Sequence, residues 1–384
     1  MPTKHASGSY TFGNHQNNTQ QRSSTKRHIF LFLKVFTITS IVTAAVILGT
    51  GTMLRSYVRP PELPGIDVIA SPIHMPPVSS NTASSAQSDN REDEYNFGGT
   101  SPELLALMEG WERKPDFYTV MILGLDRGIN TNVIMVAAYD NINQQAYLVS
   151  IPRDTRVDVQ RNRRKIVAAY PAGRVHGGGH DAGIAMVKRE IQTLIGFRPD
   201  FYVMVNFDAF VNIIDGIGGV EVDVPFHMRY DDPYQDLHID IQPGLQVLDG
   251  QNALHFARFR RANRGFRGVT DYQRIENQQL IISTVLEELM SPRAIRQIPN
   301  LISTYSNYIT TDLDLGNQLW FAEQIVRAGG INSLSTYTIP MAGGSGSPAY
   351  YEFAHRDGVL ELINRTINPF TQDITPAMVR IIAE

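Results

Sequence analysis

The chain has 384 residues, of which 42% are hydrophobic and 19% are charged, proportions typical of a globular protein rather than a disordered one. Its formal net charge of −4 gives no overall attraction to nucleic acid. It contains no cysteine, which excludes disulfide frameworks, thiolate metal sites and cysteine nucleophiles.

The N-terminal part of the chain predicts a disordered cytoplasmic tail followed by a membrane-spanning helix. Residues 1–28 are rich in Ser, Asn and Gln and have little to bury. Residues 29–54 contain an uncharged run, 35–54, which is long enough to cross a hydrocarbon core of ~30 Å as a helix. Basic residues are more frequent before this run than after it, which predicts a cytoplasmic N-terminus and an extracellular remainder. A cleavable signal peptide is the alternative.

Residues 55–100 begin with several prolines and continue with Ser, Asn and acidic residues. Prolines stiffen the first part and the polar residues cannot form a core, so we expect an extracellular linker. The remainder, 101–384, predicts one folded extracellular domain.

This domain alternates between strand and helix patterns, which predicts an α/β sandwich with a mixed central sheet. The polar residues between the second and third strands predict a hairpin. No segment of 315–384 looks separable from the domain. We expect strands at 117–125, 133–140, 146–151, 202–207 and 220–225, and helices at 181–195, 207–218 and 272–290.

Asp126 is the first candidate functional residue. It follows the apolar strand 117–125 directly, at the end of a strand where α/β sheets often present ligand groups. Its carboxylate could hold a hard cation such as Mg²⁺. An aspartate that caps a turn is the alternative.

Arg153 and Asp154 are adjacent in the run SIPRDT, where the third predicted strand ends. The guanidinium group suits phosphate oxygens because it donates two parallel hydrogen bonds and keeps its charge. A surface ion pair without function is the alternative.

The segment 254–279 holds the densest set of arginines. Arg258 and Arg260 are two residues apart on an expected strand, so they should face the same side. Asp271, Arg274 and Gln278 share one face of the next helix because they are three and four residues apart. These side chains predict a site for a multiply charged anion such as a diphosphate. The alternatives are a solvated basic loop and a patch for RNA or anionic lipid.

Two other patterns argue against common enzyme classes. The glycine-rich run HGGGHDAG at 176–183 lacks the Gly-Lys-Ser/Thr ending of a P-loop, so we expect a polar flexible loop there. The sequence has no Gly-x-Ser-x-Gly motif, which argues against an ordinary serine hydrolase.

Five motifs, taken in order, resemble those of the LytR-CpsA-Psr family: LGLD, VIMVAAYD, SIPRDT, GLQVLDGQNALHFARFR and DYQRIENQQ. The resemblance spans about 116–365. It implies an α-β-α domain with an apolar groove for a polyprenyl chain and a mouth that holds a diphosphate with Mg²⁺. It also implies a cell-membrane enzyme of a Gram-positive type envelope.

The resemblance assigns roles to particular residues. Asp126 and Asn132 stand at metal positions, and the diphosphate ligands would be Arg153, Arg258, Arg260 and Arg274, with support from Asp271 and Gln278. The catalytic set would then contain Asp126, Arg153, Asp154 and Asp271.

The implied reaction joins a lipid-linked glycopolymer to the cell wall. A sugar hydroxyl of peptidoglycan attacks the proximal phosphorus of a polyprenyl diphosphate carrier, and undecaprenyl phosphate leaves. The polymer would be anionic, such as teichoic acid or capsular polysaccharide. Asp126 and Asp154 are both candidates for the base that takes the acceptor proton. Nucleic acid is not an expected partner, because the predicted topology places every basic cluster outside the membrane.

The sequence departs from the family pattern beside Asp126. Where the family commonly has Arg-Ser-Asp-Thr, this chain has Asn130, Thr131, Asn132 and Val133. Asn132 keeps an oxygen but loses the charge, which should weaken Mg²⁺ binding. This departure keeps open a module that binds lipid diphosphates without turnover. A polyprenyl pyrophosphatase, which would use the same site with water as the acceptor, is a further alternative.

Overall fold

The computed structural model describes residues 58–65, 106–126, 129–176, 178–234, 237–289, 309–327, 334–345 and 350–382. The predicted tail 1–28 and membrane helix 29–54 lie outside these ranges, as does most of the predicted linker 55–100. Within the described ranges, no helix combines the length and hydropathy that a membrane span requires. The helices and strands named below all belong to one compact unit, Pro60–Glu384.

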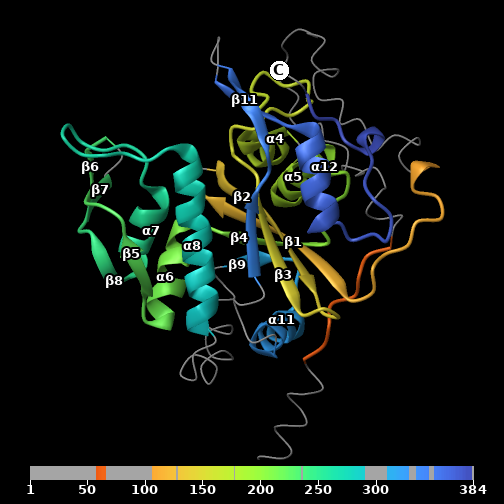
Figure 1. The fold of residues 1–384 in the computed structure, drawn as a ribbon, viewed down its shortest axis with the longest axis horizontal. Coiled ribbons are helices and arrows are strands. Elements are labelled where there is room, and N and C mark those ends of the chain that lie inside the picture. The colour runs from red at the N-terminus through yellow and green to blue at the C-terminus, as the bar shows by residue number, and fades with distance from the viewer. Residues whose placement is uncertain are drawn as a thin grey trace, which may run out of the picture. The chain divides into compact units, whose positions relative to one another are not determined.

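A mixed six-stranded sheet forms the centre of this unit, in the order β10-β3-β2-β1-β4-β9 (Figure 1). β1 pairs antiparallel with β2 and parallel with β4, and β2 and β3 form the predicted hairpin. The late strands β9 and β10 complete the two edges, so the C-terminal segment belongs to the same sheet. The bounds are β1 Phe117–Leu125, β2 Thr131–Asp140, β3 Gln145–Ser150, β4 Phe201–Val205, β9 Ile309–Thr311 and β10 Leu334–Thr338.

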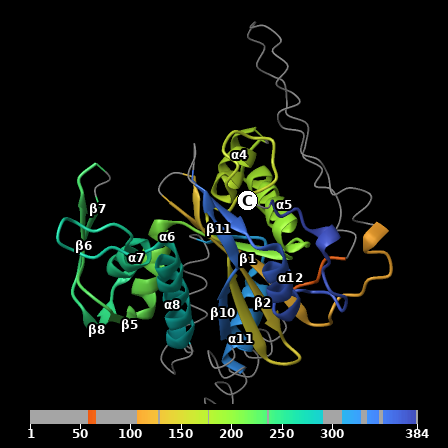
Figure 2. The same ribbon diagram turned by 45° about the horizontal axis from the view of Figure 1, so that its top comes forward.

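Helices α4 (Ala169–His176), α5 (His180–Ile195) and α12 (Arg356–Arg365) lie together on one side of the sheet (Figures 1 and 2). The expected apolar face of α5 is confirmed, because it packs into the main core with α12 and the sheet. Its buried members are Ile184, Val187, Ile191 and Leu194. The run 176–183, expected as a flexible loop, mostly belongs to α4 and α5, with Gly178 and Gly179 at positive φ between them.

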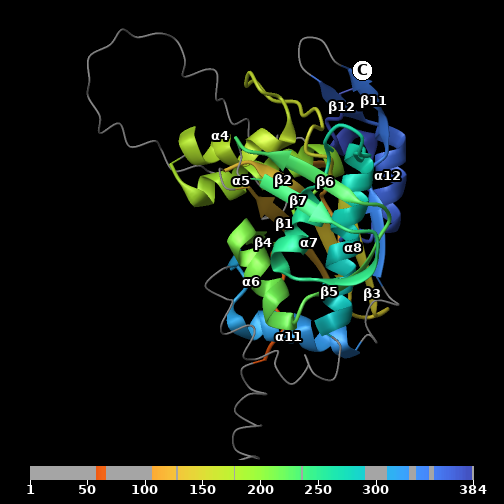
Figure 3. The same ribbon diagram turned by 90° about the vertical axis from the view of Figure 1, so that its left-hand side faces the viewer.

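A second group of elements covers the other side of the sheet (Figures 1 and 3). Their buried apolar residues, among them Val220, Phe256 and Ile281, form a second hydrophobic cluster. The group contains α6 Phe207–Ile217, α7 Gly250–Arg258, α8 Asp271–Leu289, and the antiparallel pairs β5 Val220–Val224 with β8 Gly244–Leu248 and β6 Met228–Asp232 with β7 Leu237–Ile241. The remaining elements are α11 Leu315–Arg327, β11 Met341–Ser345 and β12 Tyr351–Ala354.

The expected strand through Arg258 and Arg260 is wrong, because Arg258 is the last residue of helix α7. Asp249 caps this helix by accepting a hydrogen bond from the backbone N–H of Asn252 at 2.8 Å. Ala253 and Phe256 are buried on the inner face, at the spacing of a helix. Arg260 lies beyond the helix end, so the two arginines reach the site from different local structures.

Candidate functional site

A cavity of about 1040 Å³ lies between the central sheet and the helices α6, α7 and α8. Much of its wall is apolar. Strand β1, helix α6 and helix α8 supply most of this surface, with further residues from β7 and α7. The apolar lining includes Ile122, Leu123, Leu125, Phe207, Phe210, Ile213, Leu237, Ile239, Leu254, Ile282, Val285 and Leu286.

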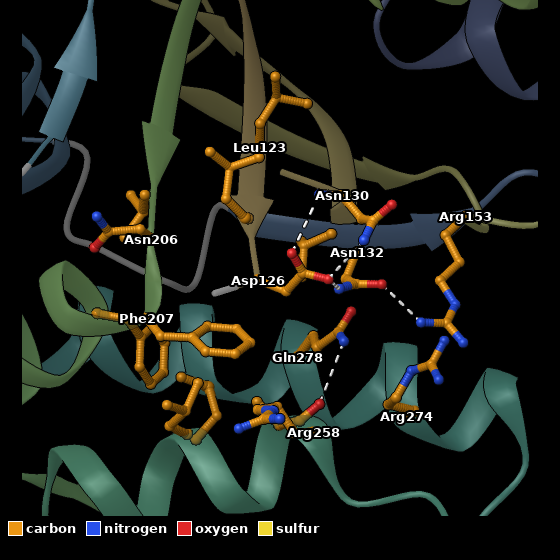
Figure 4. Close-up of a pocket in the computed structure, with 18 of the residues that line it drawn as sticks. Leu123, Asp126, Asn130, Asn132, Arg153, Asn206, Phe207, Arg258, Arg274 and Gln278 are labelled. Atoms are coloured by element: carbon orange, nitrogen blue, oxygen red, sulfur yellow. Dashed lines mark hydrogen bonds between the residues drawn. The ribbon is translucent and has the colours of Figure 1, made fainter. Parts of the chain in front are cut away.

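The same cavity is lined by seven basic side chains and two carboxylates. In Figure 4, Arg153 and Arg274 lie on one side of the cavity, Phe207 lies on the other, and Asp126 and Asn132 lie between them. The excess of positive charge suits a ligand with several negative charges. The charged residues are Arg153, Arg163, Lys165, Arg258, Arg260, Arg261, Arg274, Asp126 and Asp154.

Asp126 is positioned by a close approach of β1 to β2. A Cβ atom on Gly124 would lie 2.8 Å from the Cβ of Val133, so this pairing requires glycine. The register shifts between Gly124 and Leu125, directly before Asp126. This irregularity carries the carboxylate of Asp126 to the cavity wall at the strand end.

Asparagine side chains surround the Asp126 carboxylate. Its Oδ1 accepts from the backbone N–H of Asn130 at 3.1 Å. Its Oδ2 accepts from the side-chain amides of Asn130 and Asn132, each at 3.0 Å. The Oδ1 of Asn132 then accepts from Nη1 of Arg153 at 2.7 Å (Figure 4). Asn132 therefore bridges Asp126 and Arg153.

The predicted Mg²⁺ ligands do not present their oxygens to a common point. Asn132 turns its N–H groups toward Asp126 and its oxygen toward Arg153. Hard cations need several oxygen ligands, preferably charged ones. Among the described residues, no three His, Asp or Glu side chains come together as a metal-binding group. In this arrangement, the described residues around Asp126 and Asn132 do not fit a resident Mg²⁺ ion.

Arg274 is the most enclosed of the arginines at this site, with 8% of its side chain exposed. It lies 2.8 Å from Asp271, and Asp271 also binds Arg260 at 2.9 Å. Burial, together with the positive charge of Arg153, lowers the pKa of Arg274 to about 10. Asp271, predicted as a catalytic residue, does not line the cavity, but it contacts two arginines that do.

Arg258 and Gln278 complete the predicted set. The guanidinium of Arg258 lies 4.4 Å from the ring centroid of Phe207, a cation–π contact across the cavity wall. Nε2 of Gln278 donates to the backbone oxygen of Ala257 at 3.3 Å. The structure thus places every predicted metal and diphosphate residue in one cavity lining, with Asp154 beside them.

The sequence analysis missed a second basic group at this cavity, Arg163 and Lys165. Lys165 binds Asp154 at 2.8 Å, and Nε of Arg153 lies 3.7 Å from the same carboxylate. The basic run that follows SIPRDT was the available signal. Arg264 and Arg267 of the arginine-rich segment are not among the residues that line the cavity.

Tyr350 is a further residue of the lining that sequence reasoning did not single out. Its hydroxyl donates to Glu352, and this hydrogen bond is the main cause that raises the pKa of Tyr350 to about 12. Because its single O–H donates to Glu352, Tyr350 can offer a ligand only the lone pairs of its oxygen.

Known proteins resemble this chain in both sequence and fold. Polyisoprenyl-teichoic acid–peptidoglycan teichoic acid transferase TagV of Bacillus subtilis (strain 168) is 30% identical over 214 residues, which are 53% of this chain and 51% of that protein. Regulatory protein MsrR of Staphylococcus aureus (strain COL) is 26% identical over 202 residues, 51% of this chain and 56% of that protein. The chain thus spans about half the length of these curated relatives.

Solved structures share the fold. The crystal structure of B. subtilis TagV has a TM-score of 0.53 at 23% identity, covering 65% of this chain and 95% of that one. A structure of TagT bound to LIIa-WTA has a TM-score of 0.51 at 19% identity, covering 65% and 88%. The model of the LytR_cpsA_psr family matches residues 77–367. This chain belongs to the LytR-CpsA-Psr family.

Proposed function

We propose that this protein is a membrane-anchored phosphotransferase that attaches anionic glycopolymers, carried on a polyprenyl diphosphate, to peptidoglycan. The observation that carries the proposal is the joint lining of one cavity by apolar side chains and by seven basic ones. A polyprenyl diphosphate has the same two parts, a long apolar chain and a doubly phosphorylated head.

The apolar wall would hold the prenyl chain. Removing apolar surface from water stabilises the complex by about 25 cal/mol per Å². The cavity of about 1040 Å³ has room for several isoprene units, and α8 lines it with Ile282, Val285 and Leu286.

The arginines would bind the diphosphate. Arg153 and Arg260, from loops, and Arg274, from helix α8, all line the cavity, and guanidinium groups form paired hydrogen bonds with phosphate oxygens. Arg274 is buried beside other cations, so an anion there would relieve their mutual repulsion.

In the proposed reaction a sugar hydroxyl of peptidoglycan attacks the phosphorus that bears the glycopolymer. The bond from this phosphorus to the bridging oxygen breaks, and polyprenyl phosphate leaves. The hydroxyl proton passes to Asp126 or Asp154, the two carboxylates that line the cavity. The arginines neutralise the charge that develops on the phosphoryl oxygens, because phosphoryl transfer depends mainly on positioning and electrostatic stabilisation.

The relatives support the same reaction class. TagV of Bacillus subtilis and TagU of Oceanobacillus iheyensis are both named polyisoprenyl-teichoic acid–peptidoglycan teichoic acid transferases. Teichoic acid is therefore one candidate glycopolymer for this chain and capsular polysaccharide another. The membrane anchor and the extracellular location rest on the sequence of residues 29–54.

A transfer assay tests this proposal. The purified full chain is incubated with a polyprenyl-diphosphate glycan donor and peptidoglycan oligomers, with D126N and D154N variants in parallel. We expect polyprenyl monophosphate and a glycan–peptidoglycan product, and a rate loss of about 10² or more in the variant that lacks the base. Polyprenyl monophosphate with free glycosyl phosphate would instead identify a pyrophosphatase.

A binding module without turnover is the second candidate, and the orientation of Asn132 is the observation that favours it. Tight binding of the donor with neither transfer nor hydrolysis would establish that function and contradict the transferase.

A further inference from the structure

Asn132 sits between a hydrogen-bond acceptor and a hydrogen-bond donor. An ionised aspartate only accepts hydrogen bonds, and an arginine only donates them. The carboxamide of Asn132 has one part of each kind, and its contacts, 3.0 Å to Asp126 and 2.7 Å to Arg153, match both neighbours. Rotating the amide by half a turn would place two acceptors together and two donors together, so the orientation is fixed by its partners.

Asn130 extends the same network. Its backbone and side-chain N–H groups donate to Asp126 at 3.1 and 3.0 Å. Three hydrogen bonds from neutral amides thus reach a carboxylate that lines the cavity. Such bonds stabilise the ionised form of a carboxylate.

Arg153 depends on this network for its position. Among the described residues, Asn132 is the one side chain that its guanidinium reaches at hydrogen-bond distance, while Asp154 lies 3.7 Å away. The chain of bonds from Arg153 through Asn132 to Asp126 aligns successive dipoles, and such chains strengthen one another. Asn132 is therefore a positioning residue for Arg153.

We infer that Asn130 and Asn132 take the place of a metal ion in this site, so that the protein binds a lipid diphosphate without a divalent cation. An aspartate at position 132 would still accept from Arg153, but it would face Asp126 as a like charge. Two carboxylates at this spacing repel each other unless a cation or a shared proton lies between them. An asparagine removes that repulsion, and the basic residues of the cavity supply the positive charge for the ligand.

Metal binding tests the inference without any lipid. Mn²⁺ is titrated into the purified full chain and followed by electron paramagnetic resonance. We expect Asn132→Asp to bind Mn²⁺ at least about tenfold more tightly than the unmodified chain, because it restores a second carboxylate. Asn206→Asp is the matched control, since Asn206 also lines the cavity and caps α6, where aspartate is an equally good cap.

Two results of this titration would overturn the inference. One is that the unmodified chain binds Mn²⁺ as tightly as Asn132→Asp. The other is that Asn206→Asp gains as much affinity as Asn132→Asp, which would make added charge rather than position the cause.

A second measurement uses farnesyl diphosphate and rests on the proposed function. We expect the unmodified chain to bind it with affinities that differ by less than about threefold between EDTA and Mg²⁺, and Asn132→Asp to lose about tenfold or more in EDTA. A tenfold gain by the unmodified chain in Mg²⁺ would overturn the inference. If no variant binds farnesyl diphosphate in either buffer, the proposed function fails, and the Mn²⁺ titration still decides the role of Asn132.

Discussion

Arg274 is the most buried of the arginines that line the cavity, and its positive charge is only partly compensated. It is buried, its partner Asp271 is shared with Arg260, and Arg153 lowers its pKa further. A buried cation whose neighbours only partly compensate its charge stabilises a bound anion more than an exposed cation does.

Replacing Arg274 with alanine should weaken binding of farnesyl diphosphate by about 10- to 100-fold, because a hydrogen bond to a charged group contributes ~1.5–3 kcal/mol. Arg274→Lys keeps the charge but not the paired donors, so it should bind with intermediate affinity. Isothermal titration calorimetry measures both. Unchanged affinity in Arg274→Ala would remove Arg274 from the diphosphate site.

At the scale of helices and strands, α7 is a segment whose N-cap helps to make it a helix and not a strand. The run ARFR at 257–260 alternates apolar and basic residues, and this alternation predicts a strand. Asp249 and Gly250 begin a helix instead, and the buried Ala253 and Phe256 hold it against the second core. The N-cap and the tertiary packing therefore outweigh the strand preference of the local alternation.

Removing this cap should destabilise the domain without touching the cavity. Asp249→Ala is expected to lower the free energy of unfolding by about 1 kcal/mol and Tm by about 2–4 °C. Asp249→Asn keeps a capping oxygen, so its Tm should be close to that of the unmodified chain. Circular dichroism measures the Tm of each variant, and equal Tm values for the two variants would contradict the role of Asp249.

Helix α8 supplies both parts of the proposed ligand site, because Arg274 and Gln278 precede Ile282, Val285 and Leu286 on the cavity-facing side. Leu280 lies on the same helix but is 42% exposed. This difference provides a matched pair of variants.

Ile282→Glu should weaken farnesyl diphosphate binding by at least about tenfold, because it places a charge where the apolar chain would lie. Pyrophosphate binding should change much less. Leu280→Glu adds the same charge at an exposed position and should bind both ligands as the unmodified chain does. Equal losses in the two variants would show that the apolar wall at Ile282 does not contact the ligand.

At the scale of the whole molecule, the sequence predicted the four inner strands of the central sheet but not its edge strands β9 and β10, and it did not predict the full site. The apolar runs that become β1, β2 and β3 are bounded by polar turns, and their pairing brings Asp126, Asn132 and Arg153 together. Arg163 and Lys165 reach the same cavity through a loop whose path no periodicity encodes. The rotation of the Asn132 amide depends on two neighbours in space, so no sequence pattern could reveal it.

Family membership, mixed sheet and cavity together support one central claim: a single cavity holds a prenyl chain against its apolar wall and a diphosphate among its arginines. The most direct test measures the affinity of the full chain for pyrophosphate and for geranyl, farnesyl and geranylgeranyl diphosphate by calorimetry. The account predicts that affinity rises by at least about tenfold for each added isoprene unit until the cavity is filled, because each buried CH₂ group contributes ~0.8 kcal/mol before the losses of ordering. An affinity independent of prenyl length, or no binding of any diphosphate, would contradict it.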